Sequence, residues 1–476
     1  MEMRSIYENI SPIDSRYSLK SKGAFELLAP YLSAEAEIRY CTRAEIALVK
    51  THLVLGKRDA KLTDELAGEL DEVVKKVLPE EVIEEEKKTQ HNIRALVNVM
   101  KTKVPEAVAP LVHLGATSAD ILDTAFSMRV RDAVTKVILP MLRDCEVVLC
   151  NLAEKEADTP QVGRTHGQHA VPITFGYAVA EYVSRLGKSI LRIEELVKDL
   201  RGKFAGATGS YNAVSLIAKK PLEFEKTYLE FLGLLPSEYS HQLVEPEYML
   251  RVLLECNIAF GIIANIADDL RNLQRTEIGE VFEFFSATQV GSSTMPQKRN
   301  PWNSEHVKSL WKAFAPRVLT FYMDQISEHQ RDLSNSASQR FVADYLTGFG
   351  LAIGRMHSIL SGLNADKNAM QKNLLSGGGK VQGGVLAEPA YILLAEAGES
   401  DGHEIIRQIT VEAEEKSISF YDVLKSKENI FNILTKQLQK LNFENPEDFF
   451  KNPANYKGLA SERAKHLAKK YRDMMK

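Results

Sequence analysis

Residues 291–301, which read GSSTMPQKRNP, place two serine hydroxyls close to two cations. The glycine frees the backbone, and each proline fixes φ and cannot donate a hydrogen bond, so the segment suits neither a helix nor a strand. An ordinary surface loop does not need cations beside its serines, whereas a loop that closes over an anion does. The pattern predicts such a loop, and it contains Ser292, Ser293, Lys298 and Asn300.

Residues 163–176, GRTHGQHAVPITFG, hold two histidines among turn-forming residues, directly before a long apolar segment. The polar members are Thr165, His166, Gln168 and His169. Packing does not readily explain two imidazoles here, whereas proton transfer does, because imidazole has the unperturbed pKa nearest neutrality. The cluster therefore predicts a general acid or base.

Two clusters near the N-terminus suit anion binding, and each has an ordinary alternative. Arg16 and Tyr17, in SPIDSRY, either clamp a phosphate or carboxylate or belong to a surface turn. His91, in EEKKTQHNI, either lines a site or begins a helix.

In VHLGATSADILDTA, Thr117 and Ser118 stand before a long helical pattern, with His113 just upstream. Either hydroxyl makes a good N-cap. The N-terminus of a helix also attracts anions, because its N–H groups are unsatisfied and its dipole is positive there. Both interpretations stay open.

The fifth cluster joins Glu305, which follows the opening loop, to the segment EHQRDLSNSASQR with Arg331, Ser336 and Arg340. Solvated arginines are the alternative explanation. Together the five clusters predict a site for a multiply charged substrate. Without a metal or cofactor motif, the expected chemistry is proton transfer and anion stabilisation by side chains.

Long helices are expected to position these five clusters, because the sequence around them has helical periodicity. Apolar residues recur at three- and four-residue steps through residues 119–157, 175–200 and 245–274, while alternating strand patterns are almost absent. Such segments exceed the roughly 10–14 residues of an average globular helix. The pattern predicts an all-α fold with long central helices. Changes in composition predict three domains, at residues 1–114, 115–365 and 366–476.

The 175–200 helix carries apolar residues on more than one face, which predicts burial on each of them. Self-association into a closed homo-oligomer would provide that burial. The stripe consists of Val179, Tyr182, Val183, Leu186, Ile190, Ile193 and Leu196, flanked by Tyr177, Ala178 and Ala180.

Composition argues against several classes of protein. The 60 Lys and Arg against 64 Asp and Glu, for a net charge of −4, disfavour a nucleic-acid binder. No apolar run reaches about 18 residues, so no membrane association is expected. The absence of a secretory pattern predicts a cytoplasmic location. HEIIR lacks the second zinc-binding histidine and GGGK is followed by Val381, so neither metal nor cofactor is expected. Four cysteines without a C-x-x-C pair predict free thiols.

These motifs resemble the fumarase/aspartase superfamily. GSSTMPQKRNP matches every fixed position of its signature loop, roughly G-S-S-x-M-P-x-K-x-N-P, and HLGATSADILDTA and GRTHGQHAVPITFG resemble its first two conserved regions. Within it, SPIDSRY, KTQHN, RTHGQ and QRDLSNSASQR are most similar to the adenylosuccinate lyase branch. The resemblance spans most of residues 11–410. One departure is Asn92, where that branch usually has an aspartate, so the charge beside His91 is missing.

The resemblance implies a three-domain, all-α subunit in a homotetramer, with each active site built from three subunits. It also implies β-elimination of fumarate from the nucleotide adenylosuccinate, giving AMP, and from SAICAR, giving AICAR. Ser292 would be the base, helped by Lys298 and by N–H groups around Ser293, and His166 the acid oriented by Glu305.

The resemblance also implies which residues would bind the substrate. The succinyl part would contact Thr117, Ser118, Asn300 and Gln242. The phosphate and ribose would contact Arg16, Tyr17, Arg331, Ser336 and Arg340, with His91 and His113 near the phosphate and Thr165 beside the acid.

Three other functions compete with this one. A second lyase of the superfamily, of argininosuccinate lyase or cycloisomerase type, would not explain both SPIDSRY and QRDLSNSASQR, which suit a nucleotide. A catalytically inactive structural paralogue would have no reason to keep Ser292, His166, Lys298 and Glu305. A helical nucleic-acid binder is disfavoured by the near-neutral charge.

Overall fold

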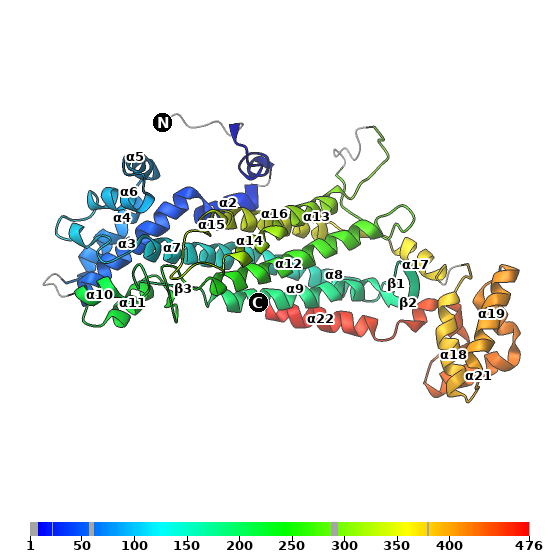
Figure 1. Cartoon of the computed structure of the whole chain (residues 1–476). Helices are drawn as coiled ribbons and strands as arrows, with labels where there is room; N and C mark the ends of the chain where they lie inside the picture. The colour runs from blue at the N-terminus through cyan, green and yellow to red at the C-terminus, as the bar shows by residue number, and fades with distance from the viewer. Residues whose placement is uncertain (1–7, 21, 57–60, 287–293, 378–379, 476) are drawn as a thin grey trace. The chain divides into compact units, whose positions relative to one another are not determined.

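The computed structural model of the chain describes residues 8–20, 22–56, 61–286, 294–377 and 380–475. Helices account for most of them, as Figure 1 shows, which confirms the predicted mostly α class. The chain divides into two compact units. Unit 1 comprises Met1–Leu142, Lys188–Gly261 and Ser309–Gly354, and unit 2 comprises Arg143–Gly187, Ile262–Lys308 and Arg355–Lys476. This division does not test the three predicted domains, which stay a prediction.

Unit 1 contains elements from the N-terminal third and from two later stretches of the chain. They are η2 (Ile13–Tyr17), α1 (Ser18–Lys20), α2 (Lys22–Leu32), α3 (Ala34–Leu55), α4 (Asp64–Lys76), α5 (Pro79–Thr89), α6 (Asn92–Lys101), η3 (Ala109–Leu111), α7 (Ser118–Ala133), η4 (Val134–Ile138), β3 (Arg201–Gly202), α10 (Asn212–Ile217), α11 (Pro221–Glu230), β4 (Leu235–Pro236), η5 (Ala315–Arg317), α14 (Val318–Met323) and α15 (Ser336–Arg340).

Unit 2 holds the C-terminal elements and a β-hairpin. They are β1 (Pro160–Thr165), β2 (Gln168–Thr174), β5 (Val281–Phe282), β6 (Asn364–Ala365), α17 (Lys367–Leu375), η6 (Gly384–Leu386), α18 (Ala387–Glu396), α19 (Gly402–Lys416), α20 (Phe420–Ser426), α21 (Glu428–Lys440), η7 (Pro446–Lys451), η8 (Pro453–Tyr456) and α22 (Ala460–Met474). Five helices contribute residues to both units: α8 (Leu139–Lys155), α9 (Phe175–Val197), α12 (Pro246–Leu273), α13 (Trp302–Phe314) and α16 (Val342–Ser361).

The long periodic segments form the expected helices. The 119–157 segment is α7 and α8 joined by the π-helical turn η4, while α9 and α12 cover the other two. By length and composition α12 could cross a membrane, but 56% of its most apolar window is buried inside the protein. That burial agrees with the long central helix that the periodicity of residues 245–274 predicts.

A β-hairpin is the main departure from the expected helices and turns. Strands β1 and β2 pair antiparallel, with Thr165 opposite Gln168. The two residues between them, His166 and Gly167, have φ of 53° and 73°. Positive φ at both central residues is the geometry of a type I′ turn, which matches the twist of paired strands. The described residues also contain two shorter strand pairs, β3–β4 parallel and β5–β6 antiparallel.

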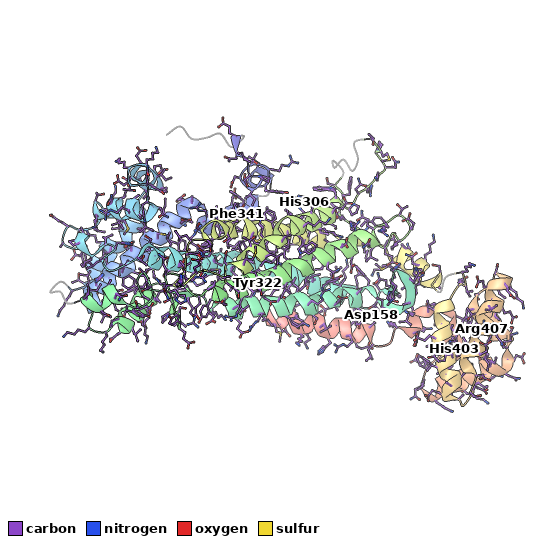
Figure 2. The ribbon with its side chains drawn as sticks, viewed as in Figure 1. Asp158, His306, Tyr322, Phe341, His403 and Arg407 are labelled. Atoms are coloured by element: carbon purple, nitrogen blue, oxygen red, sulfur yellow. The ribbon has the colours of Figure 1, made fainter. Side chains whose placement is uncertain are left out.

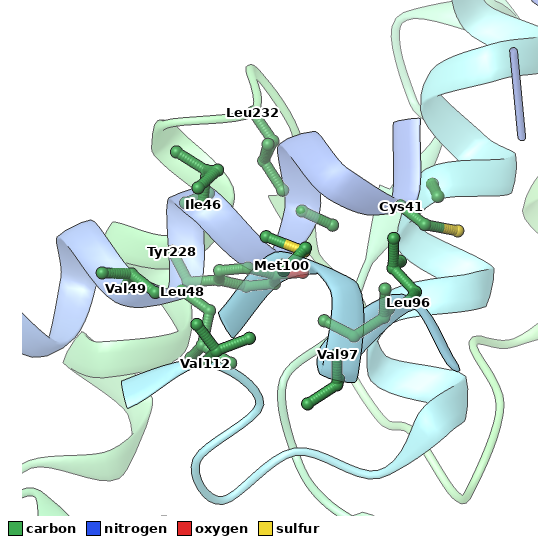
Figure 3. Close-up of a cluster of buried hydrophobic side chains, with 14 of the residues drawn as sticks. Cys41, Ile46, Leu48, Val49, Leu96, Val97, Met100, Val112, Tyr228 and Leu232 are labelled. Atoms are coloured by element: carbon green, nitrogen blue, oxygen red, sulfur yellow. The ribbon is translucent and has the colours of Figure 1, made fainter. Parts of the chain in front are cut away.

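The core of unit 1 gathers around α3 (Figure 3). Apolar side chains from α3, α6, α7, α11 and the segments beside them bury one another there. Figure 3 labels Cys41, Ile46, Leu48, Val49, Leu96, Val97, Met100, Val112, Tyr228 and Leu232. A second cluster forms in unit 2 from Val381, just before η6, to Phe450 in η7. Because packing at core density fixes the helices around the first turns of α6 and α7, the polar residues at those turns have defined places.

The apolar stripe of α9 is covered by the chain itself. Val179, Tyr182, Val183 and Leu186 are among its buried members, and only Leu196 is half-exposed. The stripe is therefore not by itself a reason for self-association, because the same chain covers it, whereas Tyr177 on the neighbouring face is still 41% exposed. Exposed apolar side chains occur elsewhere in unit 1, on and after α14: Leu319, Tyr322, Met323, Ile326 and Phe341 (Figure 2 labels Tyr322 and Phe341).

Gly176 lets α9 begin directly after the hairpin. A Cβ at this position would lie 2.3 Å from the carbonyl oxygen of Ala153 and 2.5 Å from the amide nitrogen of Ala157. Backbone atoms cannot move aside as a flexible side chain can. The close approach of the end of α8 to the start of α9 therefore requires glycine.

We expect Gly176→Ala to lower the free energy of unfolding by about 1–3 kcal/mol or more, because the added methyl overpacks a rigid contact. Urea unfolding followed by circular dichroism would measure it. The matched control is Gly68→Ala in α4, where a Cβ meets nothing within 4 Å, and which should stabilise by roughly 0.5–1 kcal/mol. Equal stability of Gly176→Ala and the wild type would contradict the close approach.

Candidate active site

His166 lies at the tip of the β1–β2 hairpin and is exposed, as is Thr165 beside it. Its left-handed backbone is uncommon for a residue other than glycine, and such conformations concentrate at functional sites. Burial and the nearby Arg164 lower the pKa of the other histidine of the hairpin, His169.

A buried carboxylate anchors strand β1 of this hairpin at both ends. Glu280, which is fully buried, accepts hydrogen bonds from both terminal nitrogens of Arg164, at 2.5 and 3.1 Å. Gln161 and Asn373 donate to the same carboxylate at 2.7 and 2.8 Å. The ion pair is well compensated, because its carboxylate oxygens accept four hydrogen bonds. The sequence analysis missed Glu280, since its partners are more than a hundred residues away along the chain or lie beyond α16.

The described part of the signature loop lines a cavity of unit 2. Lys298, Asn300 and Glu305 are among the residues around about 1440 Å³ of space. Lys298 and Glu305 are exposed, and Asn300 is half-buried. Ser292 and Ser293, the predicted base and its neighbour, lie outside the described residues. His166 does not line this cavity.

Both described ends of the loop are tied to fixed helices. Glu283 accepts hydrogen bonds from the backbone N–H groups of Asn303 and Ser304, at 3.3 and 2.7 Å, so it caps the start of α13. The amide of Gln274, just after α12, accepts from the N–H of Glu283 at 3.0 Å and donates to the carbonyl of Arg299 at 3.3 Å. Glu283 and Gln274 thus hold the segment before the loop close to the segment after it.

Unit 1 brings together six of the predicted substrate-binding residues. They line one cavity of about 690 Å³ and come from four segments: His91, Thr117, Ser118, Gln242, Ser336 and Arg340. An adjoining cavity of about 550 Å³ shares His91 and Ser118 and adds His113. These volumes suit a small-molecule ligand.

A buried ion pair fixes the helix start in this cavity. Asp120, in the first turn of α7, accepts the N–H of Thr117 at 2.8 Å, which makes Thr117 the N-cap as the sequence suggested. The other oxygen of Asp120 binds Lys203 and the N–H groups of Ala205 and Gly206. Asp120 and Lys203 are both fully buried. The carboxylate thereby holds Thr117 and the neighbouring Ser118 against a second segment of the chain.

The two histidines near this cavity have structural partners. The Nδ1 of His91 accepts the N–H of Arg94 at 3.2 Å, so His91 is the N-cap of α6, which is the alternative that the sequence left open. His113 has φ of 63°. The buried Glu45 holds it through the backbone N–H at 2.9 Å and through Nδ1 at 2.6 Å. Sequence reasoning missed Glu45, because it lies inside the apolar pattern of α3.

Three predicted phosphate ligands stand apart from the 690 Å³ cavity. Arg16 and Tyr17 end the π-helical turn η2, and Arg16 is exposed. Arg331 has φ of 83° and donates to the carbonyls of Asp324 and Gln325, at 2.9 and 3.2 Å. Its guanidinium therefore braces its own loop in this structure. The described residues contain no group of three or more His, Cys, Asp or Glu side chains arranged to hold a metal ion.

Comparisons with known proteins agree with this architecture. Residues 16–313 match the family model described as Lyase, and residues 327–446 match the one described as Adenylosuccinate lyase C-terminal. The adenylosuccinate lyase of Pyrococcus abyssi is 32% identical over 95% of this chain and 96% of its own. That of Aquifex aeolicus is 32% identical over 86% of this chain and 91% of its own.

Solved structures show the same fold. The 3-carboxy-cis,cis-muconate lactonizing enzyme of Pseudomonas putida has a TM-score of 0.77 at 25% identity and covers 94% of this chain and 97% of its own. A fumarate lyase of Mesorhizobium sp. BNC1 has a TM-score of 0.76 at 22% identity, over 94% of this chain and 97% of its own, and shows the fold alone. The sequence identity is higher to the adenylosuccinate lyases.

The Glu280 anchor should carry much of the hairpin's stability. We expect Glu280→Ala to lower the free energy of unfolding by about 3–5 kcal/mol, because it leaves the Arg164 guanidinium without its partner. Thermal unfolding and limited proteolysis between residues 160 and 174 would measure the loss. The control is Glu181→Ala, which breaks an exposed ion pair with Arg185 and should cost no more than about 1 kcal/mol. Equal effects of the two variants would contradict the anchoring role.

Proposed function

Because this chain belongs to the adenylosuccinate lyase family, we propose that it cleaves adenylosuccinate into AMP and fumarate, and SAICAR into AICAR and fumarate. The observation that carries the proposal is similarity to enzymes of that name over nearly the whole chain, together with the match to their C-terminal family model. The reaction class is a carbon–nitrogen lyase.

The reaction begins with removal of a proton from the succinyl carbon next to a carboxylate. Ser292 is the proposed base, and a serine hydroxyl is too weak for this unless the charge that develops is stabilised. The electron pair left on carbon is delocalised into the carboxylate, which gains negative charge. Lys298, which is exposed on the cavity wall of unit 2, is the group that we propose offsets that charge once water is excluded.

The second half of the reaction breaks the carbon–nitrogen bond. The electron pair forms the double bond of fumarate while the leaving nitrogen takes a proton, for which we propose His166 as donor. The exposed position of His166 on a turn lets it approach a bound ligand. Glu305 is the proposed acidic partner of this histidine.

The cavity of unit 1 would bind the substrate itself. We propose that Thr117 and Ser118, with the N–H groups at the start of α7, hold a succinyl carboxylate with the help of Gln242. Ser336 and Arg340 on the same wall would contact the phosphate and ribose, with Arg16, Tyr17 and Arg331 completing this end. Asn92, which replaces the family's usual aspartate, is exposed on the same cavity. The substitution removes a negative charge near the phosphate.

The functional enzyme is proposed to be a homotetramer whose sites each combine three subunits. Two observations support the assembly. The apolar side chains on and after α14 are exposed to water, Ile326 most of all at 83%, and a subunit interface would bury them. The proposed catalytic and substrate-binding residues also occur on separate segments, with His166 on the hairpin, Lys298 in the signature loop and Thr117 directly before α7. We propose a cytoplasmic location, which the four buried free cysteines support.

Two other functions remain to be separated from this one by experiment. A cycloisomerase or argininosuccinate lyase would share the fold and the loop, yet the similarity to adenylosuccinate lyases is higher. An inactive paralogue would share the fold, yet the proposed catalytic residues are all present in this chain.

We expect the purified protein to release fumarate from adenylosuccinate and from SAICAR, with AMP and AICAR as the second products. Chromatography of the reaction mixtures would identify them. Argininosuccinate and 3-carboxy-cis,cis-muconate, the compound that the lactonizing enzymes convert, serve as controls and should give no product. Fumarate from argininosuccinate, with none from adenylosuccinate, would make the rival lyase correct.

We expect His166→Ala and Ser292→Ala each to lower kcat by at least 10²- to 10⁴-fold, since each removes a proton-transfer group, while oligomer size stays unchanged. If sites are shared between subunits, mixed and reassembled inactive variants should regain activity, because some sites then receive both intact residues. Steady-state assays and size-exclusion chromatography test both points. No recovery despite demonstrated subunit exchange would contradict shared sites.

A further inference from the structure

Asp123 is a carboxyl on the wall of the proposed substrate cavity that has no role in the proposed reaction. It lies on α7, one turn beyond Asp120, and lines the 690 Å³ cavity together with Gln242 and Ser336. It also lines a smaller cavity of about 60 Å³ with Arg331. A titratable group in a ligand cavity is a candidate for function.

The carboxyl of Asp123 holds the segment that carries Gln242. Its Oδ2 accepts a hydrogen bond from the N–H of Val244 at 2.9 Å. Residues 241–244 belong to neither a helix nor a strand, so no regular backbone pattern fixes them. On the other side, the N–H of Gln242 donates to the carbonyl of Gln330 at 3.2 Å. One hydrogen bond therefore ties the segment to α7, and another ties it to the 325–335 loop.

The charges around Asp123 have other partners. Lys203 is paired with Asp120, and Arg331 donates to two carbonyls of its own loop. The other ionisable groups that share a cavity with it are Glu245, Tyr248 and Asp324 in the smaller one, and Glu37, His91, Arg129 and Arg340 in the larger one. Among the described residues Asp123 has no direct ion pair, so its hydrogen bond to Val244 is its main compensation.

The charge of Asp123 changes close to neutral pH. Burial raises the pKa of this carboxyl to about 6, against the opposing effects of the Val244 N–H and of the positive charges of Lys203 and Arg331, while Asp120 adds to the rise. The carboxylate predominates above pH 7 and the neutral acid below pH 5. A hydrogen bond to a carboxylate is roughly twice as strong as one to a neutral group. The hold on Val244 is therefore strongest above neutrality and weakens as the pH falls.

We propose that Asp123 is a positioning residue, whose carboxylate holds residues 242–244 against α7 and so places the Gln242 side chain for binding the substrate. This inference rests on the proposed function, in which Gln242 contacts the succinyl part. Asp123 acts through Gln242 and does not touch the reacting atoms. Its loss should therefore weaken substrate binding more than it slows the chemical step.

The first experiment measures KM and kcat for adenylosuccinate between pH 5 and 8.5 in the wild type and in Asp123→Asn. We expect Asp123→Asn to raise KM roughly tenfold at pH 8, because an amide cannot supply the charge. Its KM should vary little with pH, whereas the wild-type KM should rise as the pH falls through about 6. The value of kcat should stay within about threefold at pH 8. A KM of Asp123→Asn equal to that of the wild type at pH 8 would overturn the proposal.

A double-mutant cycle separates positioning from a general structural role. If Asp123 acts through Gln242, then Asp123→Asn should add little to the KM of Gln242→Ala, whereas independent effects multiply. The matched control is Asp132→Asn, a buried carboxyl of the same helix that binds Tyr40, Arg131 and Lys136 and lines neither cavity. Multiplicative effects in the cycle, or an equal rise in KM in the control, would overturn the proposal.

A measurement that does not depend on catalysis tests the proposal even if adenylosuccinate is not the substrate. Hydrogen exchange of the peptide that contains Val244, corrected for intrinsic rates, should be faster in Asp123→Asn than in the wild type at pH 8, and unchanged in Asp132→Asn. Absence of adenylosuccinate cleavage would reject the proposed function alone. Unchanged exchange at Val244 would reject the anchoring role of Asp123 whatever the substrate is.

Discussion

The buried ion pair of Asp120 and Lys203 is the interaction on which the unit 1 half of the candidate site depends. A carboxylate and an ammonium that are both removed from water are costly unless further hydrogen bonds satisfy them. Here the N–H groups of Thr117, Ala205 and Gly206 do so, and these groups belong to the start of α7 and to a segment after α9. The same contacts that compensate the charge therefore fix the place of Thr117 and Ser118. Asp123, one turn further along, extends this arrangement to the segment of Gln242.

Backbone strain marks several predicted site residues. His113, His166 and Arg331 all have positive φ, a conformation that side chains other than glycine rarely adopt. Each is held by a specific contact nearby: Glu45 binds His113, the I′ turn of a paired hairpin carries His166, and loop carbonyls accept from Arg331. Strain of this kind persists only where surrounding contacts over-determine it. Tertiary contacts, and not the local backbone preference of these residues, therefore determine the three conformations. This is consistent with the roles proposed for them.

The sequence predicts the helices well and their polar partners poorly. Periodicity locates α9 and α12 and the α7–α8 pair, because burial of an apolar face repeats along the chain at helical spacing. The N-cap role of Thr117 also follows from its local pattern. The hairpin is missed, because His-Gly is not the usual Asn-Gly or Asp-Gly dipeptide of a I′ turn. Glu45 and Glu280 are missed for another reason, since each binds a residue far along the chain and no local pattern encodes such a contact.

The exposure of the proposed catalytic groups explains why assembly matters for the proposed chemistry. Lys298, Glu305 and His166 are all exposed in the single chain, where water screens their charges. Stabilising a carbanion-like intermediate requires the same groups in a site from which water is excluded, where each electrostatic interaction is stronger. The stripe of α9 supplies no reason to assemble, because its own chain covers it, but the apolar side chains on and after α14 do. In the proposed tetramer, a neighbouring subunit that covers these catalytic groups would exclude that water and strengthen their interactions with the intermediate.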